Sequence, residues 1–394
     1  MKRLVKSRAI FTATDKNMIN KGWLVIEEGI IQGLGGPEQR PDREFVELED
    51  RVIDLSDYYL LPGLIDCHTH LSITPALGNQ LEQLSLPGQT NILRSIPNLY
   101  RDLAAGATTI RVMGEENYID IDIKQAIEQG LIQGPRLLTS GIGIVATNGH
   151  GAAHTVCDGR QEIQKQIRRN FARGADLVKL FATGGVSSRS STLDLPGYSR
   201  KEIRTAVEEA NMAGSYVAAH AHGGKGMDYC IEEGVRTLEH AAFVNERQLE
   251  QIADRDLWVV GTFSILFHPE GIEKNDLKNP SIRDKVMKAR EFIRENFSQV
   301  LKSGVNLAVG TDSMHGHLAW ELEFLNKLGL GPERALLVVT REAARACQIE
   351  DRLGTLAPGK IADFIAIRGN PLEDLGNLRN IEAVFKEGKE VRVD

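Results

Sequence analysis

Short apolar runs alternate with polar, amphipathic stretches through most of the chain, and eight of these runs have the length and β-branched content of single strands. They are LLPGLIDCH (60–68), TTIRVMG (108–114), RLLTSGIG (136–143), DLVKLFATGG (176–185), YVAAHAHG (216–223), TLEHAAF (237–243), WVVGTFS (258–264) and NLAVGTDS (306–313). Strands separated by helix-forming stretches indicate an α/β protein with a parallel sheet, and this number of strands predicts a closed (β/α)8 barrel. The alternative, an open doubly wound sheet, would want a glycine-rich fingerprint where this chain has HTH after its first strand.

Two of the intervening stretches illustrate the predicted helices. One helix is expected over 199–215, where Ser199 is a suitable N-cap and Glu202 completes a capping box. Gly214 is a suitable residue to end it. A second helix is expected over 290–304.

The two ends of the chain differ from the middle. Residues 22–35 have the pattern of two short strands around a Glu-Gly turn, and residues 362–393 repeat it. Since a lone hairpin is only marginally stable, we expect the two ends to meet in space and share one sheet. The predicted domains are residues 1–57 and 352–394 for a small β domain and residues 58–351 for the barrel.

Composition and charge exclude several classes of protein. The chain has 394 residues, 42% hydrophobic and 26% charged, which is ordinary for a soluble globular protein. A formal charge of −7 without a basic stripe does not favour a nucleic-acid partner. No apolar run reaches the roughly 18 residues of a membrane span, and the basic start is a poor signal peptide. A reduced, cytoplasmic setting is expected, because no CxxC pair occurs among Cys67, Cys157, Cys230 and Cys347.

The histidines all lie in the middle of the chain, at the carboxyl end of a predicted strand or in the loop that follows. They are His68, His70, His150, His154, His220, His222, His240, His268, His315 and His317. In a barrel these strand ends converge on the face that carries the active site. His68 and His70 stand two residues apart, so both imidazoles face the same side, roughly 6–7 Å apart along the backbone. Such a pair suits zinc, and the alternative is two histidines hydrogen-bonded in a polar loop.

Four further residues favour the metal hypothesis. Lys179 stands inside a predicted barrel strand, where a lysine is costly unless it is paired or modified. It either forms a buried ion pair, for example with Asp312, or is carboxylated by CO2, so that its carbamate oxygens bridge two metals. His220, His240 and Asp312 end the fifth, sixth and eighth predicted strands. Each alone is weakly informative, but together with the histidine pair they form a strong constellation on predicted strands one, four, five, six and eight.

On these residues the chain resembles the amidohydrolase superfamily of metal-dependent hydrolases. The resemblance covers nearly the whole chain, from LLPGLIDCHTHL (60–71) to DRLGTLAPGKIADFIAI (351–367). It implies a distorted (β/α)8 TIM barrel with a small β-sandwich domain built from both chain ends. NGHG, VKLFATGGVSS, AAHAHGGKG and RTLEHA look most like the prolidase-like, or Xaa-Pro dipeptidase-like, group, whose members hydrolyse amide bonds of dipeptides and N-acyl amino acids.

The resemblance also implies a ligand set for two divalent metal ions, with zinc favoured and manganese or cobalt left open. In HAH the family pattern favours His220 as the ligand and leaves His222 either to support the metal ligands or to contact the substrate. Lys179 matches the carboxylated lysine of the family. The implied ligands are His68, His70, Lys179, His220, His240 and Asp312.

The implied reaction is hydrolysis of an amide bond in a small molecule. A hydroxide that bridges the two metals attacks the carbonyl, and Asp312 transfers the proton to the leaving nitrogen. An amino-acid-like product needs donors or a cation for its carboxylate. The candidates are His150, His222, His315 and Arg189. The alternative for Arg189 is a solvated loop charge.

Two other functions compete with this hypothesis. One is a deaminase or cyclic amidohydrolase, similar to imidazolonepropionase, that uses one metal on the same scaffold. The buried Lys179 separates the two, since many one-metal deaminases lack such a lysine. The other is a barrel that has lost catalysis and serves assembly. The sequence predicts a small-molecule substrate, with neither a nucleic acid nor a membrane as partner, and leaves a homo-oligomer open.

Overall fold

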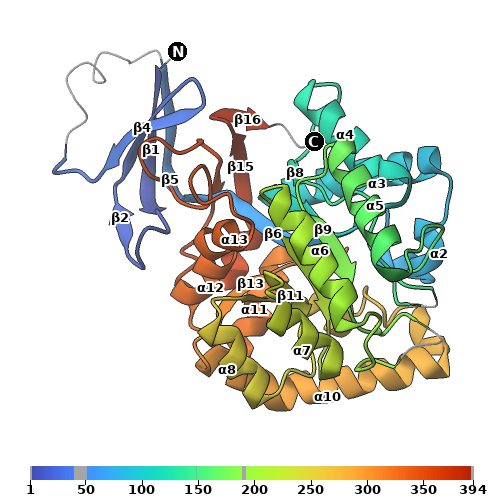
Figure 1. Cartoon of the computed structure of the whole chain (residues 1–394). Helices are drawn as coiled ribbons and strands as arrows, with labels where there is room; N and C mark the ends of the chain where they lie inside the picture. Colours follow the sequence, from blue (N-terminus) through green and yellow to red (C-terminus); the bar gives the residue numbers. More distant parts are fainter. Residues whose placement is uncertain (1, 40–50, 148, 189–191, 392–394) are drawn as a thin grey trace.

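The computed structural model of the protein describes residues 2–39, 51–147, 149–188 and 192–391. It consists of a β-sheet on one side and a larger α/β part, in which helices surround parallel strands (Figure 1). The N-terminal and C-terminal strands lie side by side in the sheet, and β15 (Ile381–Lys386) also contacts α3 (Gly88–Ala104) of the α/β part.

The sheet on the side of the molecule has eight strands, taken from both ends of the described chain. Its strands are β1 (Lys2–Phe11), β2 (Met18–Asn20), β3 (Trp23–Glu27), β4 (Ile30–Gly35), β5 (Val52–Pro62), β14 (Phe364–Ile367), β15 (Ile381–Lys386) and β16 (Lys389–Val391). Their order is β16-β15-β14-β5-β1-β3-β4, and β2 pairs with β1. β5 runs parallel to β1 and antiparallel to β14. The prediction that the two ends share one sheet is confirmed.

Both predicted Glu-Gly turns join strands of this sheet. Glu28 and Gly29 connect β3 to β4, with φ angles of 50° and 81°. Glu387 and Gly388 connect β15 to β16, with φ angles of 52° and 68°. Two central residues with positive φ give a turn whose twist matches that of the flanking strands.

The α/β part contains eight parallel strands in two sheets, and each strand overlaps one of the eight predicted runs. The three-stranded sheet is formed by β6 (Leu64–Thr69), β7 (Ala107–Val112) and β8 (Arg136–Leu138). The five-stranded sheet is formed by β9 (Val178–Phe181), β10 (Val217–Ala221), β11 (Thr237–His240), β12 (Trp258–Gly261) and β13 (Asn306–Val309). In both sheets the strands follow one another in chain order, as βα units require.

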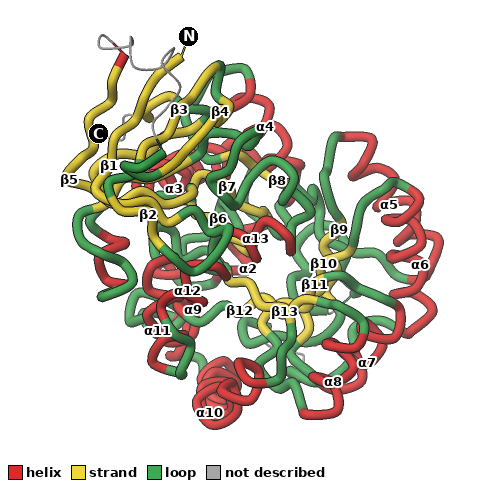
Figure 2. Tube along the Cα trace, turned by 90° about the vertical axis from the view of Figure 1, so that its left-hand side faces the viewer, coloured by secondary structure: helices red, strands yellow, loops and turns green. Residues whose placement is uncertain are grey.

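The two parallel sheets contact each other at both edges. At one edge the Asp312 N–H donates to the carbonyl of His68, which is the end of β6, over 2.8 Å. At the other, Ile144 forms an isolated parallel bridge with Leu180 of β9. Figure 2 shows β9 to β13 as a curved row with β6 to β8 beside it. A Cβ on Gly310 would lie 2.3 Å from the His68 backbone nitrogen, so only glycine permits this approach.

Helices connect the strands and cover the outside of the two sheets (Figure 1). They are α2 (Gln80–Leu84), α3 (Gly88–Ala104), α4 (Ile119–Glu128), α5 (Gly159–Arg173), α6 (Arg200–Met212), α7 (Gly224–Glu233), α8 (Glu246–Asp254), α9 (Ser264–Phe267), α10 (Pro280–Lys302), α11 (Leu318–Lys327), α12 (Pro332–Val338) and α13 (Arg341–Ala346). Short 3-10 helices are η2 (Pro75–Leu77), η3 (Glu116–Tyr118), η4 (Asp276–Lys278) and η5 (Leu375–Arg379). The main core lies between helices and strands and includes Val112, Leu180, Leu238, Val259 and Val309, all fully buried.

The helix predicted over 199–215 is confirmed as α6. Ser199 precedes it in extended conformation, and the Ser199 N–H donates to the Glu202 carboxylate over 2.8 Å. Gly214 follows it with a φ of 69°. Ile203 and Ala210, two turns apart on one face of the helix, are fully buried. The stretch predicted to be helical over 290–304 belongs to the longer α10.

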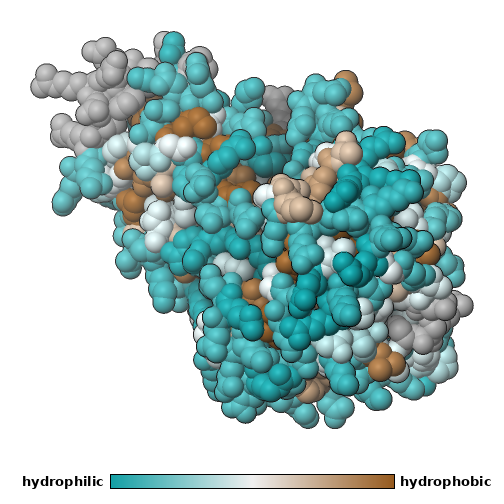
Figure 3. All heavy atoms as spheres, in the orientation of Figure 1, coloured by the Kyte–Doolittle hydropathy of each residue, from teal (hydrophilic) through white to brown (hydrophobic). Residues whose placement is uncertain are grey.

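The surface agrees with the composition. On the face shown in Figure 3, hydrophilic residues predominate and hydrophobic residues are scattered. In the described part of the chain, no helix combines the length and the apolar composition needed to cross a bilayer.

The contact at Gly310 leads to a stability prediction. Gly310→Ala is expected to lower the free energy of unfolding by about 1–3 kcal/mol, since the new methyl group must displace the end of β6. Urea denaturation measures this loss. Gly33→Ala in β4 is the matched control, because a Cβ there would lie an ordinary 3.6 Å from the Trp23 ring. Equal stability of the two variants would contradict the contact between β6 and the end of β13.

Candidate metal centre

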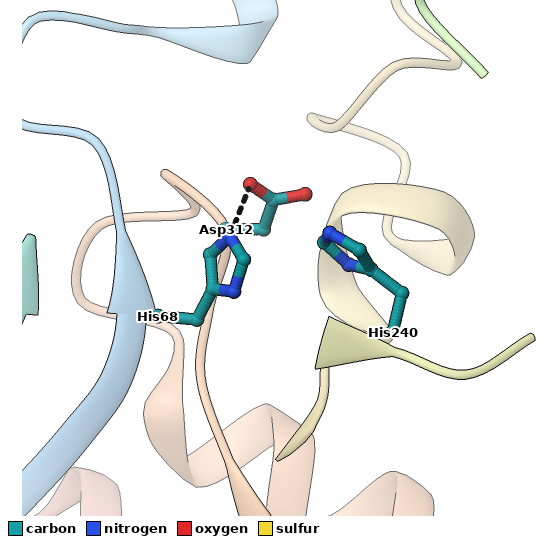
Figure 4. Close-up of side chains that lie close together, drawn as sticks. All are labelled: His68, His240 and Asp312. Carbon is teal, nitrogen blue, oxygen red and sulfur yellow. Dashed lines mark ion pairs between the residues drawn. The ribbon is translucent and has the colours of Figure 1, made fainter. Parts of the chain in front are cut away.

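The predicted metal ligands line one pocket at the carboxyl ends of the parallel strands. His68, Lys179, His220 and His240 belong to β6, β9, β10 and β11. His70 follows β6, and Asp312 follows β13. Figure 4 shows the side chains of His68, His240 and Asp312 turned toward one another, with the carboxylate between the two rings. The sequence-based expectation that strands one, four, five, six and eight bring these residues together agrees with this arrangement.

His68 and His70 are both held by their Nδ1 atoms. The Nδ1–H of His68 donates to the Glu239 carboxylate over 2.7 Å, and that of His70 donates to the Gly114 carbonyl over 3.0 Å. The acceptor-only character of these partners puts the lone pair on Nε2 of each ring. The Nε2 atoms lie 3.6 and 3.7 Å from Oδ1 of Asp312. Nε2 of His68 is buried and has no hydrogen-bond partner in the described structure.

A buried ion pair supports His68 from below. Arg111 of β7 and Glu239 of β11 are fully buried, with Nη2 and Oε1 2.9 Å apart. The same guanidinium donates from Nε to the Cys67 carbonyl over 2.6 Å, and the Thr237 hydroxyl also donates to Glu239. Glu239 therefore has its negative charge compensated and its second oxygen fixed toward His68. Such a carboxylate orients an imidazole and raises its basicity.

Lys179 is fully buried, and its ammonium nitrogen has no hydrogen-bond partner among the described residues. Nζ lies 4.8 Å from the centre of the Phe181 ring. Burial lowers the pKa of Lys179 to about 8, although the charges of Glu239 and Asp312 act in the opposite direction. The ion pair with Asp312 that the sequence left open is not formed, because no carboxylate oxygen of the described residues lies within 4.0 Å of this nitrogen.

The other histidines of the pocket form a cluster. The ring centre of His220 lies 4.6 Å from that of His240, 4.7 Å from that of His222 and 4.4 Å from that of His150. Nε2 of His220 donates to the Gly184 carbonyl over 3.0 Å, which leaves Nδ1 as its lone-pair atom. Nδ1 of His150 and Nδ1 of His222 are buried and have no partner in the described structure.

Burial determines the charge state of these groups. Together with Lys179, it lowers the pKa of His70 to about 4 and that of His222 to about 3. It also holds the pKa of His220 and of His240 well below the ordinary value. All four imidazoles are therefore neutral at pH 7, the form that binds metals. Burial raises the pKa of Asp312 to about 6, against the effect of Lys179.

His68, His240 and Asp312 form a compact group that can hold a metal ion, since one ligand atom from each lies within 4.8 Å of the others. Two neutral imidazoles and a carboxylate are a donor set that suits zinc. His70 and His220 lie outside this compact group but line the same pocket. The residues present thus fit a divalent cation, and the unpartnered Nε2 of His68 points to one.

The four predicted substrate contacts fall in different places. His150 and His222 line the pocket. His315 does not: its Nδ1 lies 2.8 Å from the Asp102 carboxylate and its Nε2 lies 3.2 Å from the Ile73 carbonyl. Arg189 lies outside the described residues.

Three pocket or support residues had not been singled out from the sequence. Arg111 and Glu239 carried a signal, since each is a charged residue inside an apolar run, as Lys179 is. Gln80 of α2 lines the pocket and is buried, but its segment has no periodicity that could have pointed to it.

Comparison with known proteins agrees with this geometry. The model of the amidohydrolase family matches residues 59–391. Ochratoxinase from Aspergillus niger is 29% identical to the chain, over 95% of this chain and 84% of the relative. Imidazolonepropionase from Maricaulis maris is 27% identical, over 88% of this chain and 87% of the relative. The crystal structure of a Xaa-Pro dipeptidase with bound methionine is 28% identical and superposes with a TM-score of 0.90, over 99% of this chain and 100% of that one.

The pair of His315 and Asp102 predicts a pH-dependent stability. Both ring nitrogens of His315 face hydrogen-bond acceptors. Only the protonated imidazole carries a hydrogen on both nitrogens and can donate to both acceptors. Burial alone would lower the pKa of His315, but the Asp102 carboxylate outweighs it and raises the pKa above 6.5. The charged histidine therefore stabilises the fold at pH values below 6.5, and this stabilisation is lost as the pH rises through the folded-state pKa.

His315→Gln is expected to cost about 3–5 kcal/mol in the free energy of unfolding at ~pH 6, because it leaves a buried carboxylate without its cation. The difference from the wild type should narrow as the pH rises to ~9. Denaturant titrations across this range measure it. In an Asp102→Asn background, His315→Gln should lower the free energy of unfolding by the same amount at low and at high pH. If the stability difference between the wild type and His315→Gln did not change with pH, the charged pair of His315 and Asp102 would be contradicted.

Proposed function

The chain belongs to the amidohydrolase family, and we propose that it is a binuclear metal-dependent hydrolase. Its reaction is the cleavage of an amide bond in a small molecule such as a dipeptide or an N-acyl amino acid. The chain is similar to an ochratoxinase and to a Xaa-Pro dipeptidase, which supports hydrolysis of carbon–nitrogen bonds.

The observation that carries this proposal is the buried, unpartnered amine of Lys179. A lysine in this position is costly unless its charge is removed or compensated. A pKa of about 8 gives it a reactive neutral fraction near neutral pH. That amine can add to CO2 and release a proton, which forms a carbamate. The carbamate has two oxygens where the ammonium had none, and it turns the lysine into a ligand.

We assign the metal-binding role to the six residues of the pocket. His68, His70, His220, His240 and Asp312 would hold two divalent ions, with a carboxylated Lys179 as the ligand that the ions share. When bound, zinc or a similar ion polarises a carbonyl and makes water acidic enough to attack it near neutral pH.

Asp312 is the proposed proton carrier. Its carboxylate lies beside both Nε2 atoms of the histidine pair and is 22% exposed, so it faces the open part of the pocket. A pKa of about 6 lets it accept a proton from the attacking water and release it to the leaving nitrogen. The wall of neutral histidines around it does not compete for that proton.

His150 and His222 are the proposed substrate contacts, because each places an unpartnered ring nitrogen in the pocket. His315 would have to break its bond with Asp102 or Ile73 to reach a substrate. Arg189 stays a prediction of the sequence.

The contacts at both edges support the two parallel sheets as one distorted (β/α)8 barrel over residues 58–351. The proposed bounds of the small β-sandwich domain are residues 1–57 and 352–394, and β5 continues from this domain to Pro62. A cytoplasmic location is supported by the four cysteines, which are all buried and free.

A deaminase or cyclic amidohydrolase on the same scaffold is the second candidate, because imidazolonepropionase is 27% identical over most of the chain. Ammonia release from an amidine substrate would support a deaminase, and ring opening of a cyclic amide without ammonia release would support a cyclic amidohydrolase. A buried lysine in β9 favours the first candidate.

Metal analysis of the purified protein tests the proposal directly. We expect about two equivalents of zinc or a similar ion per chain and loss of activity on chelation, with recovery when the ion is returned. Fewer than one equivalent, together with activity that survives a chelator, would rule out the metal mechanism.

Lys179→Ala tests the bridging role. We expect it to lower kcat/KM at least about 100-fold and to reduce the bound metal, because both ions lose a shared ligand. Lys225→Ala is the control, since Lys225 is an exposed lysine on α7. The wild type prepared without CO2 should lose activity and regain it with bicarbonate. Full activity of Lys179→Ala would defeat this assignment.

A further inference from the structure

One wall of the pocket comes from the segment after β6. Gln80, Leu81 and Leu84 of α2 line the pocket together with Ile73. Positions 80, 81 and 84 lie on one side of this short helix. The side of α2 that lines the pocket therefore carries the amide of Gln80 and the aliphatic side chains of Leu81 and Leu84. None of these residues belongs to the metal-binding set.

The amide of Gln80 is an unused donor. Gln80 is only 8% exposed, and its Nε2 has no hydrogen-bond partner in the described structure. Buried polar atoms in native proteins are normally hydrogen-bonded, and an exception requires a reason. Because this donor lies in the wall of a pocket, the acceptor that satisfies it can be a ligand atom.

The segment that carries Gln80 is held firmly in place. The Asn79 N–H donates to the Asp276 carboxylate over 2.7 Å, and Asn79 has a left-handed backbone with a φ of 49°. The Gln83 side chain accepts from the Thr74 N–H over 2.9 Å and donates to the Gly78 carbonyl over 2.7 Å. The neighbouring amide of Gln83 is thus fully used in fixing the loop, whereas that of Gln80 is left for the pocket.

The surroundings of Gln80 favour an uncharged ligand. The same pocket is also lined by Val186 from the loop after β9 and by Ile265 and Leu266 from α9. Among the described residues, Lys179 and Asp312 are the only ones with a cationic or carboxylate side chain that line the pocket, and both belong to the metal site. Within this pocket, a charged group against Leu81 and Leu84 would be desolvated with no opposite charge among the described lining residues outside the metal site, which is costly. An uncharged carbonyl oxygen needs only the donor that Gln80 offers.

The geometry points to Gln80 as a specificity-determining residue. It donates from Nε2 to a neutral oxygen in a bulky, apolar half of the amide substrate, a half that packs on Ile73, Leu81 and Leu84. This inference rests on the proposed amide hydrolysis and narrows it. A free dipeptide carries a charge in each half, so the substrate class is an amide with one uncharged half, such as an N-blocked peptide or an N-acyl amino acid.

Three compounds with the same leaving group test the inference. N-benzyloxycarbonyl-glycyl-leucine has an apolar acyl half with a neutral carbamate oxygen. ω-Phenylhexanoyl-leucine has the same length and phenyl group but lacks that oxygen. Glycyl-leucine has a charged acyl half. Dissociation constants are measured by calorimetry with the metal-loaded protein, and kcat/KM is measured wherever turnover occurs.

The wild type should prefer the benzyloxycarbonyl compound over glycyl-leucine by at least about 10-fold. Gln80→Met keeps the length of the side chain and removes the donor. It should weaken binding of the benzyloxycarbonyl compound about 10-fold, as expected for one lost hydrogen bond, and leave the phenylhexanoyl compound unchanged. Gln129→Met at the exposed end of α4 is the matched control and should change neither.

Thermal unfolding separates recognition from a structural role. An unpartnered donor gives the free protein no stability, so Gln80→Met should unfold at the wild-type temperature or above it. A lower unfolding temperature, or equal losses with both blocked compounds, would overturn the inference, as would a failure of all three compounds to bind. Binding that depends on Gln80 without hydrolysis of any amide would instead overturn the proposed function.

Discussion

The ion pair between Arg111 and Glu239 is the constraint on which the candidate site depends. It lies within the parallel strands, fully buried, and each charge is tolerated there only because the other is present. The pair joins β7 to β11 and then reaches β6 through the Cys67 carbonyl and the His68 ring. One interaction thus fixes the relative positions of three strands and the direction of an imidazole.

The pocket above this pair combines groups that would repel one another in their charged forms. Burial keeps the histidines neutral, so their rings approach to less than 5 Å between centres without electrostatic cost. The same burial weakens the hold of Lys179 on its proton. Desolvation therefore favours the neutral imidazoles that can bind a metal and the neutral amine that the proposed carboxylation of Lys179 requires.

Much of this could be predicted from the sequence. A polar residue at the end of an apolar run indicates a strand and its carboxyl end together, which is why the sequence could place His68, His220 and His240 in one pocket. The cap at Ser199 was predictable because a capping box is a local interaction. Arg111 and Glu239 were missed because the partner that makes each of them tolerable is far away in the chain. Gln80 was missed because α2, with 5 residues, is too short to show a periodic pattern in the sequence.

The order of strands in the side sheet has a consequence for how the chain is made. β5 lies between β1 and β14, and residues Tyr59 to Pro62 pair with Phe364 to Ile367, about three hundred positions further along the chain. While the ribosome is still adding the middle of the protein, one edge of β5 has no neighbour. An open, apolar edge invites pairing with other nascent chains. The C-terminal strands therefore cover this edge only at the end of synthesis, and chains that are truncated before them are prone to aggregate.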